Sequence, residues 1–226
     1  MDTQALILSL ELAAATVVVL IPLALILGRL LAYRSFAGKA WIEAMLNLPL
    51  VLPPTVIGYY LLVMLSGQSP IGAWFEETFK TGLVFHFSGL VIASVLVNIP
   101  FAVQPIQRAF ESIDPECLDA ADCSGMSWAQ KLRIVELPLA WPGLLTATVL
   151  VFAHTLGEFG VVLMVGGSIP GETKTLSIAI YDQVQAFEFE AAGQMSLILL
   201  VLALVCLALL GQLSRLGRLL GGPRRG

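Results

Sequence analysis

The sequence predicts an all-α membrane protein with five transmembrane helices. Hydrophobic residues make up 58% of the 226 residues, charged residues make up only 12%, and the mean hydropathy is +0.88. A helix needs about 20 predominantly apolar residues to cross a bilayer. Five stretches approach that length, at residues 5–31, 46–66, 84–106, 141–165 and 194–213. We therefore expect one transmembrane domain over residues 1–226, with no room for a large aqueous domain such as an ATP-binding one.

The first stretch is interpreted as a span rather than a signal peptide. No Lys or Arg precedes it, and its apolar run continues well past the length of a signal-peptide core. The fifth stretch is hydrophobic on all sides, which is typical of a helix surrounded by lipid or protein.

Prolines interrupt the first three stretches, three of them in the second. They are Pro22, Pro49, Pro53, Pro54, Pro100 and Pro105. Each removes a backbone donor and tends to kink a helix, and the freed carbonyl then needs a partner from another helix or a water-lined cavity. Two interpretations stay open: the kinks shape a bundle, or they belong to helices that line a path and change shape. The candidate residues for such a path or gate are Pro53, Pro54, Thr55, Asn98, Thr155 and Glu158.

The basic residues predict the orientation, because Lys and Arg accumulate in cytoplasmic connections. Ten of the twelve flank the first connection, the third connection or the C-terminal tail: Arg29, Arg34, Lys39, Arg108, Lys131, Arg133, Arg215, Arg218, Arg224 and Arg225. Only Lys80 and Lys174 fall in the second and fourth connections. We therefore expect the N-terminus outside and the C-terminus in the cytoplasm.

The connection at residues 111–138 is the most polar part of the chain and predicts two short helices. Asp114 before Pro115 is a helix start, and Gly125 is suited to end that helix. Ser127 with Gln130 three residues on predicts a capping box for a second helix, which we expect Pro138 to end at the membrane. A linker would not need this construction, although a solvated helical hairpin without a partner is an open alternative.

This connection also resembles a known signature. Asp119-Ala120-Ala121, three residues, Gly125, nine residues, Val135, one residue and Leu137-Pro138 is similar to the EAA signature of permease subunits of ATP-binding cassette (ABC) importers. The family pattern has Glu and Ile where this chain has Asp119 and Val135. The spacing is kept over all 20 positions.

The resemblance implies a type I ABC importer permease with a MetI-like fold in the bacterial cytoplasmic membrane. It implies that residues 115–127 form a coupling helix that docks on a separate ATP-hydrolysing subunit. The expected partners are two copies of that subunit, a second copy of this chain, an extracytoplasmic binding protein and the lipid membrane, with no nucleic acid. No cofactor is expected, and Cys117, Cys123 and Cys206 lack the spacing of a metal site.

Three further segments narrow the resemblance to permeases of molybdate importers. They read LPLVLPPTVIGYY at residues 48–60, HTLGEFG at 154–160 and PGET at 170–173. Sulfate-type permeases share related segments and stay an alternative, and these residues do not separate tungstate from molybdate. The spans carry hydroxyl and amide groups but no Lys or Arg in their middles. Such a neutral passage suits a weakly held oxyanion, although any polar solute could use it.

We expect Glu158 to lie inside the fourth span, toward the outer face. A carboxylate repels an oxyanion, so we expect a structural or gating role, with Lys174 or the backbone near Gly157 and Gly160 as its partner. For His86 and His154 we expect ordinary hydrogen-bonded histidines.

Residues 168–193 are amphipathic and predict a helix at the outer membrane surface, with or without a docked binding protein.

Two other classes of protein are alternatives to an importer subunit. An intramembrane hydrolase needs a nucleophile with a positioned base, and the sequence offers no such pair. A secondary transporter calls for embedded acidic relays or inverted repeats, for which Glu158 alone gives little support. We therefore expect a transport subunit that is not itself an enzyme.

Overall fold

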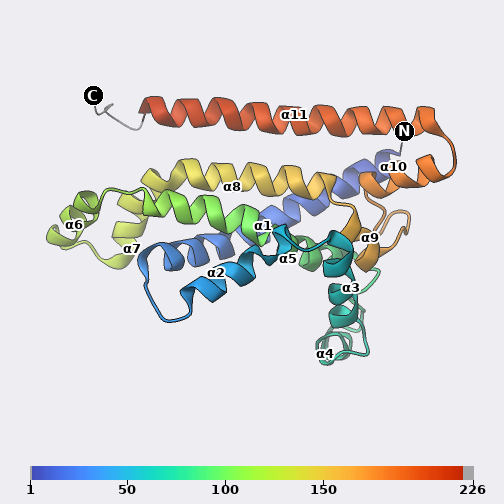
Figure 1. The fold of residues 1–226 in the computed structure, drawn as a ribbon, viewed down its shortest axis with the longest axis horizontal. Helices are drawn as coiled ribbons and strands as arrows, with labels where there is room; N and C mark the ends of the chain where they lie inside the picture. The colour runs from blue at the N-terminus through green and yellow to red at the C-terminus, as the bar shows by residue number, and fades with distance from the viewer. Residues whose placement is uncertain (1, 221–226) are drawn as a thin grey trace.

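The computed structural model describes residues 2–220, with side chains through residue 212, and these residues are helical with short connections (Figure 1). The long helices run side by side along the longest axis of the molecule. The helices are α1 (Thr3–Tyr33), α2 (Lys39–Asn47), η1 (Leu48–Leu50), α3 (Pro54–Leu65), α4 (Pro70–Phe79), α5 (Phe87–Glu111), α6 (Pro115–Cys123), α7 (Trp128–Lys131), η2 (Leu132–Glu136), α8 (Leu137–Gly157), α9 (Gly160–Gly166), α10 (Leu176–Gln185) and α11 (Phe189–Leu220).

Helices α1, α5 and α8 pack against one another and enclose the largest apolar cluster. Small residues allow this close approach, as is common between membrane helices. A side chain at Gly28 of α1 would collide with Ile106 of α5, and one at Gly143 of α8 would collide with Ala109 and the Pro105 carbonyl. The three-helix core therefore depends on glycines at its crossings.

The second predicted span is broken in the structure. Helix α2 is continued by η1, which ends at Leu50, and α3 begins at Pro54; the two parts of the span meet at an angle of 107°. Pro53 and Pro54 cause the break, because two consecutive residues lack the amide hydrogen that would continue the helix. Helices α3 and α4 consequently project away from the bundle (Figure 1).

The third and fourth predicted spans also differ from the observed helices at their ends. Helix α5 begins at Phe87 rather than residue 84, because Phe85 has a positive φ of 64°. The fourth helix ends at Gly157, and a separate short helix, α9, begins at Gly160. The predicted stretch 141–165 is therefore two helices with a break at Glu158 and Phe159.

The predicted surface helix at residues 168–193 is reduced to α10 between two loops. Leu176, Ile178 and Ala179 of α10 are buried, and the helix packs against α1 and α11. Part of its apolar side thus packs against protein, whereas Tyr181 and Val184 stay exposed.

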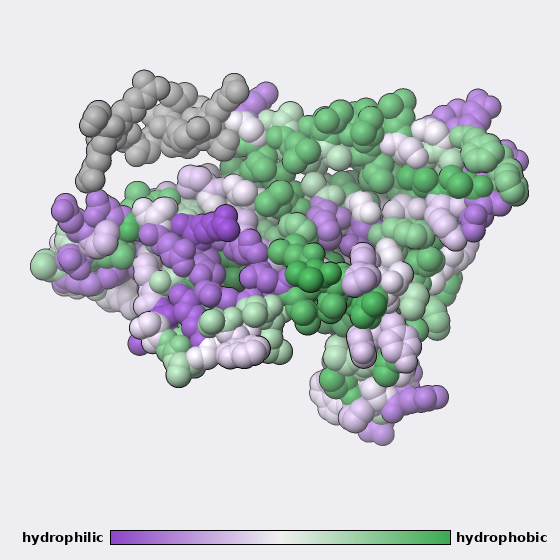
Figure 2. All heavy atoms as spheres, viewed as in Figure 1, coloured by the Kyte–Doolittle hydropathy of each residue, from purple (hydrophilic) through white to green (hydrophobic). Residues whose placement is uncertain are grey.

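Within residues 2–220, four helices are long and apolar enough to cross a membrane by length and composition, or up to five if the bent pair counts as one span. Helix α11 is the most exposed, with only 6% of its most apolar window buried. Figure 2 shows hydrophobic residues over the middle of α11 and of the bundle, and hydrophilic residues gathered around α6 and α7. The tail residues Arg224 and Arg225 lie outside the described residues, as do the side chains of Arg215 and Arg218.

Candidate functional site

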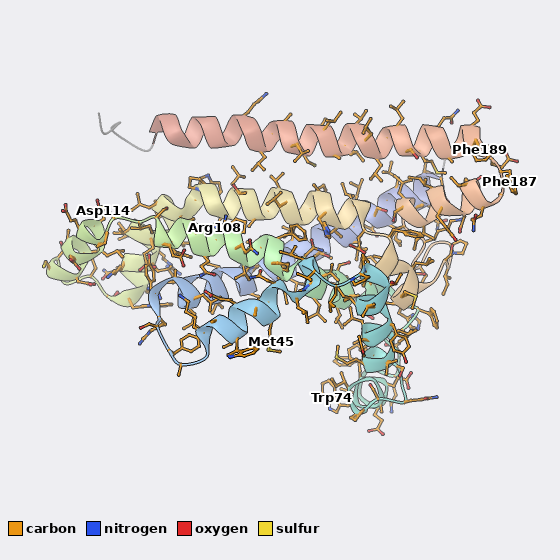
Figure 3. The ribbon with its side chains drawn as sticks, in the orientation of Figure 1. Met45, Trp74, Arg108, Asp114, Phe187 and Phe189 are labelled. Atoms are coloured by element: carbon orange, nitrogen blue, oxygen red, sulfur yellow. The ribbon has the colours of Figure 1, made fainter. Side chains whose placement is uncertain are left out.

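The hairpin of α6, α7 and the π turn η2 forms one end of the molecule (Figure 3), and local hydrogen bonds fix its shape. The Asp114 carboxylate accepts a hydrogen bond from the Glu116 amide at the start of α6, with Pro115 in the first turn. Gly125 has a φ of +70°, and the amides of Gly125 and Met126 donate to the carbonyls of Asp122 and Ala121. This Schellman arrangement ends α6 as predicted, at a backbone conformation that favours glycine.

The second half of the hairpin begins as predicted but does not end at Pro138. Ser127 and Gln130 form the predicted capping box. The helix then passes through the π turn at Leu132–Glu136 and continues directly into α8, with Pro138 in the first turn of α8. The prediction that Pro138 ends this helix is wrong, because the π turn changes the hydrogen-bond register just before the proline that cannot donate.

The signature residues of the hairpin lie around one apolar hollow of about 430 Å³. Ala120 and Ala121 of α6 line one wall, and Val135 and Pro138 line the other. The remaining lining residues are Cys117, Ser124, Met126, Ile134 and Leu139. Residues up to 18 positions apart in the signature therefore share one surface.

The other signature residues surround this hollow without lining it. Asp119 is exposed on α6, Gly125 forms the turn, and Leu137 is half-buried at the start of α8. On the same hairpin, Lys131 Nζ lies 2.7 Å from Asp122 Oδ2, which ties α6 to α7.

One feature of the hairpin was missed at the sequence level. Glu136, at the end of the π turn, is 1% exposed and forms a two-pronged ion pair with Arg29 of α1. The available signal was an acidic residue inside the otherwise apolar run VELPLA, close to the predicted membrane edge.

A second candidate site is a polar cluster between α5 and α8. The Asn98 amide nitrogen donates to the Ser94 carbonyl at 2.8 Å and to Thr155 Oγ1 at 3.2 Å. His154 Nδ1 lies 3.1 Å from Asn98 Oδ1, and its ring stacks on Phe101 with centroids 4.2 Å apart. Asn98 is fully buried, so these bonds satisfy a polar group that would otherwise be costly to bury.

Glu158 lies at the helix break beside this cluster, not inside a continuous span. Its Oε1 accepts a hydrogen bond from the Val161 amide at 3.2 Å, and its carbonyl accepts one from the Ser177 hydroxyl at 2.6 Å. The predicted backbone partner is therefore present. The alternative partner was wrong, because Lys174 pairs instead with Asp182 at 3.0 Å.

The two helix breaks lie next to each other. A side chain at Gly160, the first residue of α9, would meet Pro54 at 2.8 Å and the Thr55 amide at 3.8 Å. Pro53, Pro54 and Thr55 are exposed at the start of α3. The structure thus brings the break after α2 and η1 to the break after α8, close in the chain to Thr155 and Glu158.

The PGET segment lies in the loop between α9 and α10, toward the opposite end of the molecule from the hairpin (Figure 1), and its contacts explain its residues. Glu172 Oε1 lies 3.3 Å from His86 Nδ1 and 3.4 Å from the Phe87 amide at the start of α5. Thr173 is buried and donates to the Gly166 carbonyl at 2.7 Å. This loop therefore fixes the start of α5 to the end of α9, and both histidines have the polar neighbours expected of them.

Comparison with known proteins gives consistent results. Residues 20–218 match the family described as binding-protein-dependent transport system inner membrane component. The chain is 45% identical to the molybdenum transport system permease protein ModB of Azotobacter vinelandii over 84% of both chains. It is 31% identical to the sulfate transport system permease protein CysT of Escherichia coli over 86% of this chain and 70% of that protein.

Among solved structures, the fold is similar to a bacterial ABC transporter involved in the import of the acidic polysaccharide alginate. The TM-score is 0.75 at 17% identity, covering 94% of this chain and 78% of that chain. At this identity the likeness concerns the fold alone.

Proposed function

Because the chain belongs to the family of binding-protein-dependent transport system inner membrane components, we propose that it is the permease subunit of an ABC importer for molybdate. The observation that carries this proposal is the 45% identity to a molybdenum permease over most of both chains, against 31% to a sulfate permease. The protein is a multi-pass protein of the cytoplasmic membrane and a transport subunit rather than an enzyme.

The hairpin is proposed as the surface that receives the ATP-hydrolysing subunit. Its hollow is lined by Ala120, Ala121, Val135 and Pro138, and small residues at the first two positions leave space for an inserted partner side chain. Asp119 stands exposed beside the hollow and suits a basic partner residue. Two copies of the ATP-hydrolysing subunit, one for each of two permease chains, are part of this proposal.

The proposed orientation of the protein in the membrane follows from this role of the hairpin. The hairpin must lie in the cytoplasm to meet an ATP-hydrolysing subunit, and Lys131 and Arg133 on it agree with the positive-inside rule. The loop of the PGET segment lies at the other end of the bundle, on the proposed extracytoplasmic side. A binding protein loaded with molybdate is expected to deliver the ion there.

The helix breaks are proposed as part of the pathway or its gate. Broken helices at membrane depth are tolerated where they are buried in protein or line a polar cavity. Asn98 and Thr155 supply neutral polar groups there, while Pro53, Pro54 and Thr55 begin the helix that faces the break at Glu158.

The test is transport by the complete complex reconstituted in vesicles with its ATP-hydrolysing subunit and binding protein. We expect ATP-dependent uptake of molybdate, and uptake of tungstate because it has nearly the same size and charge. Sulfate serves as the competing oxyanion. ATP-dependent uptake of sulfate without uptake of molybdate would overturn the substrate assignment, and uptake driven by an ion gradient without ATP would indicate a secondary transporter.

A further inference from the structure

The ion pair between Arg29 and Glu136 joins the hairpin to the first membrane helix. Arg29 Nε donates to Glu136 Oε2 at 2.5 Å, and a terminal guanidinium nitrogen of Arg29 donates to Oε1 at 2.9 Å. Both carboxylate oxygens are therefore engaged by one planar fork, the strongest geometry available to this pair of residue types. The Glu136 side chain is 1% exposed and that of Arg29 is 23% exposed.

The surroundings make the pair more than a surface contact. A buried carboxylate is costly unless an opposite charge and hydrogen bonds compensate it, and Arg29 supplies both. The guanidinium also lies 5.4 Å from the ring centroid of Tyr33 and 5.3 Å from that of Trp128. Arg29 thus contacts the hairpin twice, at Trp128 where its second helix begins and at Glu136 where the π turn ends.

The position of Glu136 connects this pair to the docking hollow. Val135, directly before Glu136, and Pro138, two residues after it, both line the hollow. The residues that a docked partner would contact are therefore adjacent in the chain to Glu136. The π turn at Leu132–Glu136 is a local departure from α-helical hydrogen bonding, and such turns are points where the backbone can adjust.

We propose that Arg29 and Glu136 are positioning residues that make α1 move together with the hairpin when the ATP-hydrolysing subunit moves it. The proposal rests on the proposed function for the role of the hairpin. It adds a specific mechanical link, because α1 packs along both α5 and α8 and so carries the motion into the core that lies next to the helix breaks. Without the pair, the hairpin still docks, but its movement reaches α1 less directly.

The experiment uses the complete complex in vesicles and measures the number of molybdate ions taken up per ATP hydrolysed. The variants are Glu136→Gln, which keeps the shape of the side chain, Arg29→Lys, which keeps the charge without the fork, and the double variant Arg29→Lys with Glu136→Gln. The matched control is Lys39→Gln, which breaks the more exposed ion pair between Lys39 and Glu43, 3.7 Å apart, near the same end of the molecule.

We expect Glu136→Gln and Arg29→Lys to retain the ATP-hydrolysing subunit on purification. The ratio of uptake to hydrolysis should fall about tenfold in each, within the usual range of coupling energies. The double variant should lose no more than the worse single variant, because both changes break one shared link. Lys39→Gln should keep the wild-type ratio.

Three results would overturn the proposal. They are an unchanged ratio in both single variants, losses that multiply in the double variant, and failure of both single variants to retain the ATP-hydrolysing subunit, which would make the pair purely architectural. A wild-type complex that carries sulfate or tungstate but not molybdate would refute only the substrate assignment. The ratio measured with the oxyanion that it does carry still tests the ion pair.

Discussion

Thr155 and Thr16 are two buried threonines with the same local hydrogen bond. Each hydroxyl donates to the carbonyl four residues earlier at 2.8 Å, Thr155 on α8 and Thr16 on α1. Thr155 differs in one respect, because it also accepts a hydrogen bond from the Asn98 amide. A comparison of the two threonines therefore distinguishes the effect of losing the local hydrogen bond from the effect of losing the contact with Asn98.

Replacing Thr155 with Val is therefore expected to lower molybdate uptake about fivefold to tenfold, since one partner of the buried Asn98 amide is lost. Val keeps the shape of the side chain and replaces the hydroxyl with a methyl group. Thr16→Val is the control and should transport at the wild-type rate. Equal uptake by the two variants would exclude Thr155 from the proposed pathway.

The backbone conformation of Gly125 leads to a second prediction about a single residue. Its φ of +70° costs a β-branched residue about 1–2 kcal/mol, whereas Asn tolerates this conformation. We expect Gly125→Val to weaken retention of the ATP-hydrolysing subunit about tenfold and to lower uptake with it, and Gly125→Asn to remain close to the wild type. Space is not the cause, because no atom lies within 4 Å of the added carbon. Equal retention by both variants would show that the hairpin does not depend on this turn.

At the scale of elements, the molecule combines continuous and broken helices. Helices α1, α5 and α8 form a tightly packed core, whereas α3 and α9 are short pieces set against it. The contact between Pro54 and Gly160 holds the two breaks together. The two breaks therefore form one packed unit.

Substituting Gly160 with Ala tests this unit. The added carbon would lie 2.8 Å from Pro54, closer than ordinary contact allows, so α3 and α9 must separate slightly. We expect a loss of about 1–3 kcal/mol in stability together with lower uptake. The readouts are the thermal denaturation midpoint of the purified complex and transport in vesicles. The control is Gly193→Ala on α11, where no atom lies within 4 Å of the added carbon, and it should change neither the midpoint nor transport. A wild-type midpoint for Gly160→Ala would contradict the close contact.

The elements also show which predictions a sequence can support. The caps of α6 and α7 were predicted correctly because each depends on residues within three or four positions, such as Ser127 and Gln130. The break at Glu158 was not predicted, because no proline marks it and the flanking residues are apolar. The side chain that stabilises it is the same Glu158 that was assigned to the interior of a span. Tertiary pairs such as Arg29 with Glu136 leave no local pattern.

On the scale of the whole molecule, apolar residues cover the middle of the long axis and polar residues gather toward its two ends (Figure 2). The hairpin forms one end, and Figure 3 places Phe187 and Phe189 at the other, where α10 passes into α11. Helices α1, α5, α8 and α11 run between these ends. This arrangement predicts that the hairpin and the PGET loop face different compartments.

The native cysteines test that prediction directly. Cys117 and Cys123 are exposed on α6, whereas Cys206 lies within α11. A membrane-impermeant maleimide should label the protein in inside-out vesicles and leave it unlabelled in right-side-out vesicles. The variant with Cys117→Ser and Cys123→Ser, which retains Cys206, should lose the label. Labelling of the wild type from the outer side alone would reverse the proposed orientation.

The ion pair between Arg29 and Glu136 has a consequence for how this family evolves. The two residues are 107 positions apart, and the EAA signature leaves position 136 unspecified. A descendant that loses Glu136 would retain a guanidinium without its carboxylate, so selection should favour a compensating change at position 29. Aligned relatives should therefore show these two positions changing together, one in the first helix and one in the signature itself.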